Sequence, residues 1–210
     1  MKNIFLSLIL FCTISSVRAQ KKAITETGQE VVLNENGTWN YLNSEDEEQI
    51  LKISLNPEKF NKSENSNFLL KSKKNNIGFW LNSKKWEFKK AESNPDAEYE
   101  LQRRGEDLYG LILTEKIEVP LESLRNIALE NGKDVAPDLQ IVKEEYRIVN
   151  GQKVLLLQMN GTMQGIKISY YNYYFSNSNG STQFMTYTSQ NLLNSYLKDC
   201  EELLNGLVKL

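Results

Sequence analysis

The chain has 210 residues, with 25 Lys and Arg, 27 Asp and Glu, and no histidine, so its formal net charge is −2. This weak negative charge argues against a surface that binds polyanions as a whole. The absence of histidine excludes Ser-His-Asp and Cys-His nucleophilic systems and every histidine-ligated zinc site.

Residues 1–19 have the form of a secretory signal peptide. A charged start precedes an apolar run from Ile4 to Ile14, and small side chains lie before a cleavage site after Ala19. The run is shorter than the roughly 20 residues that span a bilayer. Cys12 lies inside this run after Phe11, which argues against lipoprotein processing. We therefore expect an exported protein, periplasmic or secreted, with no transmembrane segment after cleavage.

Residues 20–42 predict a small β-hairpin module or three-stranded meander. The run Thr25 to Gly28, with Val32-Leu33 and Gly37-Thr38-Trp39 after it, resembles an N-terminal motif common in exported bacterial proteins of unknown function. Trp39 either stacks on a ligand or, with Tyr41, holds this small sheet together. Residues 43–67 are rich in Asn, Ser and charged side chains, and we interpret them as a polar linker.

Residues 68–210 carry the pattern of a globular domain. Short strands precede a helix predicted from Pro120 to Asn131, since proline is tolerated in a first helical turn. A meander of long antiparallel strands follows from Ile141 to Ser189, with a type I′ hairpin turn at Asn150-Gly151. A second amphipathic helix follows the meander, with apolar residues at helical spacing from Leu193 to Leu207 and a stop at Asn205-Gly206.

The central strands of the meander are apolar on both faces. Val154 and Leu156 lie on one face of a strand, and Leu155, Leu157 and Met159 on the other. Such strands are typical of a sheet that is covered on both sides. We therefore expect the two helices to form the covering layers.

The element order is strands, a helix, four antiparallel strands and a C-terminal helix, which resembles the PsbP-like and DcrB-like α/β/α sandwich over roughly residues 68–210. The predicted fold class is α+β, with an antiparallel β-sheet covered by helices on both faces and a small N-terminal β-hairpin. Members of this fold are mostly non-catalytic binding or accessory proteins, which is what the resemblance implies for function. The resemblance assigns no binding residue in this chain.

The densest unusual feature is a cluster of tyrosines. Together with Trp39, it gives the candidate ligand-binding residues: Tyr170, Tyr171, Tyr173, Tyr174 and Trp39. Tyrosine joins an apolar ring to a polar tip, which suits pockets and interfaces. The other interpretation of the cluster is packing beneath the helices.

Other candidate chemistry is sparse. Cys200, the only cysteine after cleavage, lies on the apolar stripe of the last helix and is interpreted as a buried hydrophobe. Glu98 and Glu100 share a strand face but have no motif around them. A basic stretch between residues 71 and 90 has seven lysines against Glu87, and solvated strand ends are its simplest interpretation. We expect no catalytic residue, no cofactor and no metal.

The predicted function is that of an exported non-catalytic binding or accessory protein in the bacterial envelope, with an unknown envelope protein or ligand as its partner and no nucleic acid. The alternative is a small-ligand carrier or carboxylate-type hydrolase with a tyrosine-lined cleft. An exposed apolar patch favours the first, and a tyrosine-lined pocket with two facing carboxylates favours the second.

Overall fold

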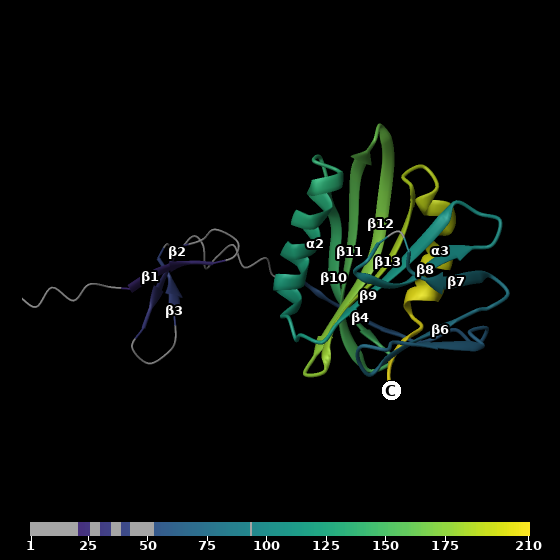
Figure 1. Ribbon diagram of the computed structural model, residues 1–210, viewed down its shortest axis with the longest axis horizontal. Helices are drawn as coiled ribbons and strands as arrows, with labels where there is room; N and C mark the ends of the chain where they lie inside the picture. The colour runs from purple at the N-terminus through teal and green to yellow at the C-terminus, as the bar shows by residue number, and fades with distance from the viewer. Residues whose placement is uncertain (1–20, 26–29, 35–38, 43–52, 93) are drawn as a thin grey trace, which may run out of the picture. The chain divides into compact units, whose positions relative to one another are not determined.

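The computed structural model describes residues 21–25, 30–34, 39–42, 53–92 and 94–210 (Figure 1). The predicted signal peptide lies outside these residues. The chain divides into two units, Met1–Leu51 and Lys52–Leu210. In the first unit, three short strands pair antiparallel in chain order: β1 (Lys21–Ile24), β2 (Glu30–Leu33) and β3 (Trp39–Tyr41).

The second unit is built on an eight-stranded sheet with the order β4-β10-β11-β12-β13-β9-β8-β7. Its strands are β4 (Leu55–Phe60), β7 (Trp86–Lys90), β8 (Ala97–Arg103), β9 (Leu108–Glu115), β10 (Gln140–Val149), β11 (Gln152–Met163), β12 (Ile166–Asn177) and β13 (Gly180–Ser189). β4 runs parallel to β10, and every other neighbouring pair is antiparallel. The sheet is therefore mixed.

The predicted hairpin is confirmed. Asn150 and Gly151 have φ values of 48° and 80°, and β10 pairs with β11 on either side of them. Positive φ at both central residues is what a type I′ turn requires. The side chain of Asn150 also donates to the carbonyl oxygens of Asn205 and Leu207, at 2.8 Å each, so the turn holds the C-terminal segment.

β11 and β12 are interior strands and are buried on both faces. Leu155, Leu157 and Tyr174 pack in one apolar cluster, and Leu156 and Tyr173 pack in a second cluster on the opposite face. The first cluster is completed by α2 (Leu121–Val135), which contributes buried Leu124 and Ala128. This helix follows Pro120, as predicted, but continues beyond Asn131 to Val135.

The second cluster is covered by a helix and by another sheet. α3 (Leu193–Leu204) supplies Cys200, Leu203 and Leu204, and a three-stranded sheet adds further core residues. That sheet has the order β14-β6-β5, with β5 (Phe68–Lys71), β6 (Ile77–Leu81) and β14 (Leu207–Lys209). Figure 1 shows α3 and β6 together on the side of the unit away from α2.

The predicted fold class, an antiparallel sheet with helices covering both faces, is wrong. The described residues hold fourteen strands and only two helices, and the large sheet is mixed. The physical reason lies in the covering layers. α2 packs on β11 and β12. Farther along the same face, Tyr187 and Tyr109 stay partly exposed and Gln102 is exposed, so among the described residues no helix covers the β13-β9-β8-β7 half. On the opposite face, the small sheet does much of the covering that a helix was expected to do.

The range predicted as a linker, residues 43–67, contains strand β4. Tyr146 N donates to Ser54 O at 2.8 Å, and Asn150 N donates to Phe60 O at 2.9 Å, so β4 is bonded along the edge of β10. The Phe60 ring lies 4.2 Å from the Arg147 guanidinium, a cation–π contact that fixes the end of this strand. β4 is therefore an integral edge strand of the main sheet.

Candidate functional site

Three of the four predicted tyrosines lie in the core. Tyr171 donates to Glu201 Oε1 at 2.8 Å. Tyr173 accepts from Arg147 Nη1 and donates to Asn205 Oδ1, at 2.9 Å each. Burial raises the pKa of Tyr173 to about 12. Tyr174, buried on the α2 face, accepts from Asn172 Nδ2 at 3.1 Å. These hydroxyls are engaged inside the protein.

The remaining predicted residues lie nearer the surface. Tyr170 is partly buried at the margin of the α2 cluster. Trp39 belongs to the first unit, where its side chain is 49% exposed. The four tyrosines belong to the second unit, and the ligand-binding role of all five residues stays a prediction.

The uncovered half of the α2 face carries a row of aromatic and polar side chains. Strand register places Tyr170 opposite Tyr187, Tyr187 opposite Tyr109, Tyr109 opposite Gln102, and Gln102 opposite Glu87. We call these five residues the tyrosine row. Directly opposed residues lie on the same face of a sheet, so the row crosses five strands from β12 to β7. With about 4.8 Å between strands, it extends about 19 Å.

The tyrosine rings of the row are in contact. The ring centroids of Tyr109 and Tyr187 are 5.5 Å apart and the rings are stacked, at 23° to each other. Tyr170 and Tyr187 are 5.9 Å apart at 41°. Such offset aromatic pairs stabilise each other beyond simple burial. Burial also raises the pKa of Tyr187 and of Tyr170, so both hydroxyls are neutral donors at physiological pH.

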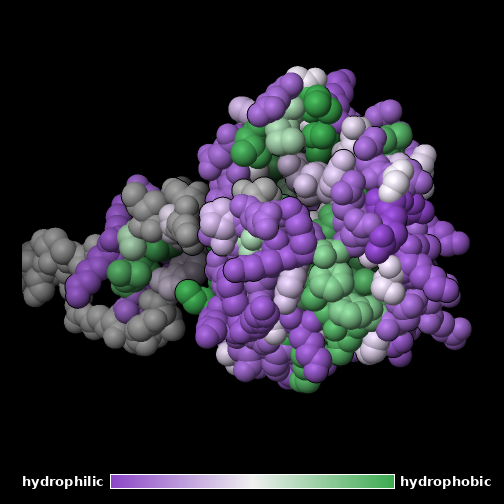
Figure 2. Space-filling model, turned by 45° about the vertical axis from the view of Figure 1, so that its right-hand side comes forward, coloured by the Kyte–Doolittle hydropathy of each residue, from purple (hydrophilic) through white to green (hydrophobic). Residues whose placement is uncertain are grey.

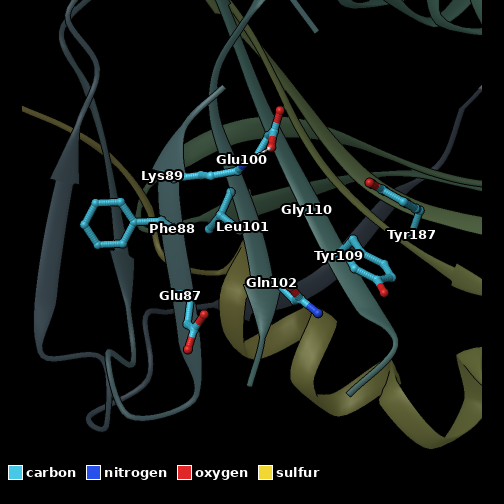
Figure 3. Close-up of a pocket in the computed structure, with 9 residues that line it drawn as sticks. All are labelled: Glu87, Phe88, Lys89, Glu100, Leu101, Gln102, Tyr109, Gly110 and Tyr187. Carbon is cyan, nitrogen blue, oxygen red and sulfur yellow. Dashed lines mark ion pairs between the residues drawn. The ribbon is translucent and has the colours of Figure 1, made fainter. Parts of the chain in front are cut away.

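A shallow hollow of about 310 Å³ lies over the β7, β8 and β9 end of the row. Figure 3 shows Glu87, Gln102, Tyr109 and Tyr187 around it, while the Phe88 ring points away from it. This volume is at the lower limit for sites that enclose a small ligand, about 300 Å³. The hollow is open to solvent, so a ligand would lie across it and not inside it.

The charges around the hollow are paired. Lys89 Nζ lies 3.2 Å from Glu100 Oε2 and 3.4 Å from Glu92 Oε2, and the hydrogen bond with Glu100 holds the pKa of Lys89 above its ordinary value. Glu87 is paired with Arg104. The site therefore offers carboxylate oxygens, an ammonium group, an amide and phenol hydroxyls as hydrogen-bonding groups, without a lone activated acid or base.

Glu98 and Glu100 do not share a face, contrary to the simple alternation of the sequence. A register shift between Ala97 and Tyr99 places Glu98 in a bulge. Its carboxylate accepts from Ser72 Oγ at 2.6 Å and from the backbone N–H of Lys73 at 2.7 Å, which ties it to the β5–β6 turn. Glu98 is thus structural, and only Glu100 reaches the hollow.

The sequence pointed to Tyr170 but missed the rest of the row. Tyr109, Gln102 and Glu87 stand alone among unlike neighbours in the sequence, and Tyr187 lies in an alternating strand with no motif. Only the pairing of β13 with β9, which are separated by a helix and three strands of the sheet, brings them together. The alternation of each strand gives the face of each side chain, but no local signal gives this register.

Other possible centres are inert or absent among the described residues. Cys200 is buried, as predicted, and burial raises the pKa of its thiol to about 11, so it is not a thiolate at neutral pH. No group of His, Cys, Asp and Glu that could hold a metal ion occurs in the described part of the chain.

The second unit is similar in fold to solved structures of other proteins. The domain superimposes on cyanobacterial PsbP (CyanoP) from Synechocystis sp. PCC 6803 with a TM-score of 0.54 and 10% identity, over 70% of this chain and 95% of that one. The domain has a PsbP-like fold. The predicted resemblance is therefore confirmed for the fold, although the helix coverage expected from it was not.

Two further solved structures are similar to the PsbP-like domain. PA94 from Pseudomonas aeruginosa, a protein of unknown function and putative regulator, matches with a TM-score of 0.45 and 12% identity over 68% of this chain and 96% of that one. LpqN, involved in cell envelope biogenesis of Mycobacterium tuberculosis, matches with a TM-score of 0.35 and 10% identity over 70% and 78%. No family model and no curated protein matches the sequence. In the described residues, no helix is long and apolar enough to cross a membrane.

Proposed function

We propose that this chain is an exported, non-catalytic binding protein whose PsbP-like domain binds a glycan strand along the tyrosine row. The observation that carries this proposal is the line of Tyr170, Tyr187, Tyr109, Gln102 and Glu87 across five strands. A line about 19 Å long on an open surface fits a segment of a polymer better than a single metabolite.

The chemistry of the row favours a polymer of hydroxyl-bearing rings. Phenol rings offer apolar surface to the C–H face of a sugar, and their hydroxyls offer hydrogen bonds beside it. Gln102, Glu87 and Glu100 add amide and carboxylate groups that bond sugar hydroxyls. A nucleic-acid strand is a poor fit, because Glu87 and Glu100 would repel its phosphates.

Binding without catalysis is supported by the pairing of the two carboxylates. A glycosidase uses one carboxyl group as an acid and a second as base or nucleophile. Glu100 is bonded to Lys89 and Glu87 to Arg104, so each carboxylate already has a cationic partner.

The proposal is tested by co-sedimentation of the chain from Gln20 onward with an insoluble cell-wall glycan, and by titration with soluble oligosaccharides of that glycan. We expect saturable binding that Tyr187→Ala and Tyr109→Ala each weaken by about fivefold to tenfold. Tyr196→Ala is the matched control, because Tyr196 is a partly buried tyrosine of α3 that packs against the other core cluster. Equal binding by all three variants would contradict the proposal.

The second candidate is a carboxylate-type hydrolase or small-ligand carrier, and it is favoured by the fact that Glu87 and Glu100 line the same hollow. Product analysis of the same oligosaccharides separates the two. Time-dependent release of shorter chains that Glu100→Gln abolishes would establish the hydrolase. Saturable binding of a monosaccharide as tight as that of the oligosaccharide would establish the carrier.

A further inference from the structure

A second surface of the PsbP-like domain combines exposed aromatic rings with unpaired lysines. Phe68 on β5 and Phe88 on β7 are 40% and 38% exposed, and their ring centroids are 5.1 Å apart. Tyr99 packs edge-on against Phe88 at 6.4 Å, and its hydroxyl donates to Lys71 O at 3.1 Å. These contacts make one continuous aromatic surface from three strands.

This surface is separate from the tyrosine row. Phe88 alternates with Glu87 and Lys89 along β7, so its ring lies on the opposite face of the sheet from the hollow, as Figure 3 shows. Figure 2 shows a hydrophobic patch within a largely hydrophilic surface on the side where β6 and β7 come forward. Phe68 and Phe88 are among the exposed large hydrophobic residues of the described chain.

Lysines surround these rings. Lys90 lies on the same face of β7 as Phe88 and directly opposite Tyr99, and Lys71 ends β5. Lys73 lies in the β5–β6 turn, and Lys84 in the β6–β7 turn beside Asn67, which accepts from Ser83. In the described part of the chain, none of these four exposed lysines forms an ion pair. The rings therefore lie within a positive rim on a chain whose net charge is negative.

We propose that this aromatic–lysine surface, defined as Phe68, Phe88 and Tyr99 with Lys71, Lys73, Lys84 and Lys90, docks the domain on an anionic lipid surface. Apolar rings flanked by basic side chains are the composition of a surface that enters the boundary between headgroups and acyl chains. The complementary partner is anionic, because the four rim lysines are exposed and form no ion pair among the described residues.

The type of basic residue favours lipid over an acidic protein segment. All four rim residues are lysines, which are point charges on flexible stems, whereas arginine provides the fixed fork that pairs with carboxylates. Lysines that come from two turns and two strands suit a fluid array of phosphates, which needs no fixed geometry. Long stems also let the ammonium groups reach the headgroups while the phenyl rings enter.

The test is flotation of the chain from Gln20 onward with vesicles of phosphatidylglycerol and phosphatidylcholine in equal amounts, and with vesicles of phosphatidylcholine alone. Residues 1–19 are omitted because their apolar run would bind vesicles by itself. We expect binding to the anionic vesicles to be at least tenfold stronger, and to weaken when salt is raised from 50 to 500 mM.

Two sets of variants test the two components separately. Each of Lys71→Gln, Lys84→Gln and Lys90→Gln should weaken binding by about fivefold, because a lysine near an anionic membrane contributes about 1 kcal/mol. Phe88→Ser should weaken it by a similar factor. Lys116→Gln and Ile117→Ser are the matched controls, because both residues are exposed elsewhere, in the segment before α2. They should leave vesicle binding unchanged.

Three results would overturn the proposal. The first is equal binding to both kinds of vesicle, or none to either. The second is an equal effect of the controls and the surface variants. The third is binding to soluble polyglutamate that is stronger than binding to the anionic vesicles, which would assign the surface to an acidic protein segment. The lysine variants touch no core side chain, so they remain informative even if Phe88→Ser lowers stability.

Discussion

Replacement of Tyr173 by Phe tests whether the central tyrosines are structural. The hydroxyl of Tyr173 links buried Arg147, which is 3% exposed, to Asn205 at the end of α3. Phe retains the ring and creates no large cavity, but it removes two hydrogen bonds. A hydrogen bond to a charged group contributes about 1.5–3 kcal/mol and one between neutral groups about 0.5–1.5 kcal/mol. We expect Tyr173→Phe to lower the free energy of unfolding by about 2–4 kcal/mol.

The assay is urea unfolding of the chain from Gln20 onward, followed by tryptophan fluorescence and circular dichroism. The control is Tyr109→Phe, whose hydroxyl has no hydrogen-bond partner among the described residues and which should change stability by less than about 0.5 kcal/mol. Arg147 keeps Glu145 at 2.6 Å and Glu201 at 3.2 Å in the variant, so the domain should still fold. A structural role of the Tyr173 hydroxyl is refuted if Tyr173→Phe lowers the free energy of unfolding no more than Tyr109→Phe does, with the same slope of that free energy against urea concentration in both variants.

Gly206→Ala should lower the free energy of unfolding in urea by about 1–3 kcal/mol or more, because the added Cβ would overlap the carbonyl oxygen of Trp80. Gly105→Ala is the control, because a Cβ there meets no atom within van der Waals contact. The free energy of unfolding should fall as pH rises from about 9 to about 12. Burial raises the pKa of Cys200 to about 11 and of Tyr173 to about 12, so the unfolded chain loses these protons at a lower pH than the folded chain does. A melting temperature that is constant over this range would contradict the prediction. Intact mass of native material should show a chain that begins at Gln20, and a retained Met1 would exclude the predicted cleavage.

The sequence predicted those parts of the fold that local patterns encode. The Asn150-Gly151 turn, the apolar strands of the meander and the stripe of α3 each depend on residues close together in the chain. The Asn150 turn and the two-sided burial of Leu155 and Leu156 therefore agree with the structure. Pro120 likewise marked the start of α2, because its consequence for the backbone is local.

The predictions that failed needed information about distant pairing. The end of the last helix at Asn205-Gly206 was predicted correctly, but the strand after it was not. Leu207 pairs with Phe79 of β6, and Trp80 N donates to Gly206 O at 2.8 Å, so a distant strand decides its conformation. β4 was not predicted, because it is a six-residue edge strand that is only partly buried, and its polar sequence shows little alternation of apolar and polar side chains. The tyrosine row was not predicted either, because the register between strands that are distant in the sequence brings its residues together.

The central claim, that the tyrosine row binds an extended glycan without cleaving it, is tested most directly by mapping bound oligosaccharide on the isotope-labelled chain by nuclear magnetic resonance. The account predicts saturable shifts of the amide signals of Tyr170, Tyr187, Tyr109 and Gln102, in a line across β12, β13, β9 and β8, with the oligosaccharide recovered at its original length. Shifts confined to other strands, or no shifts with any glycan at millimolar concentration, would contradict it.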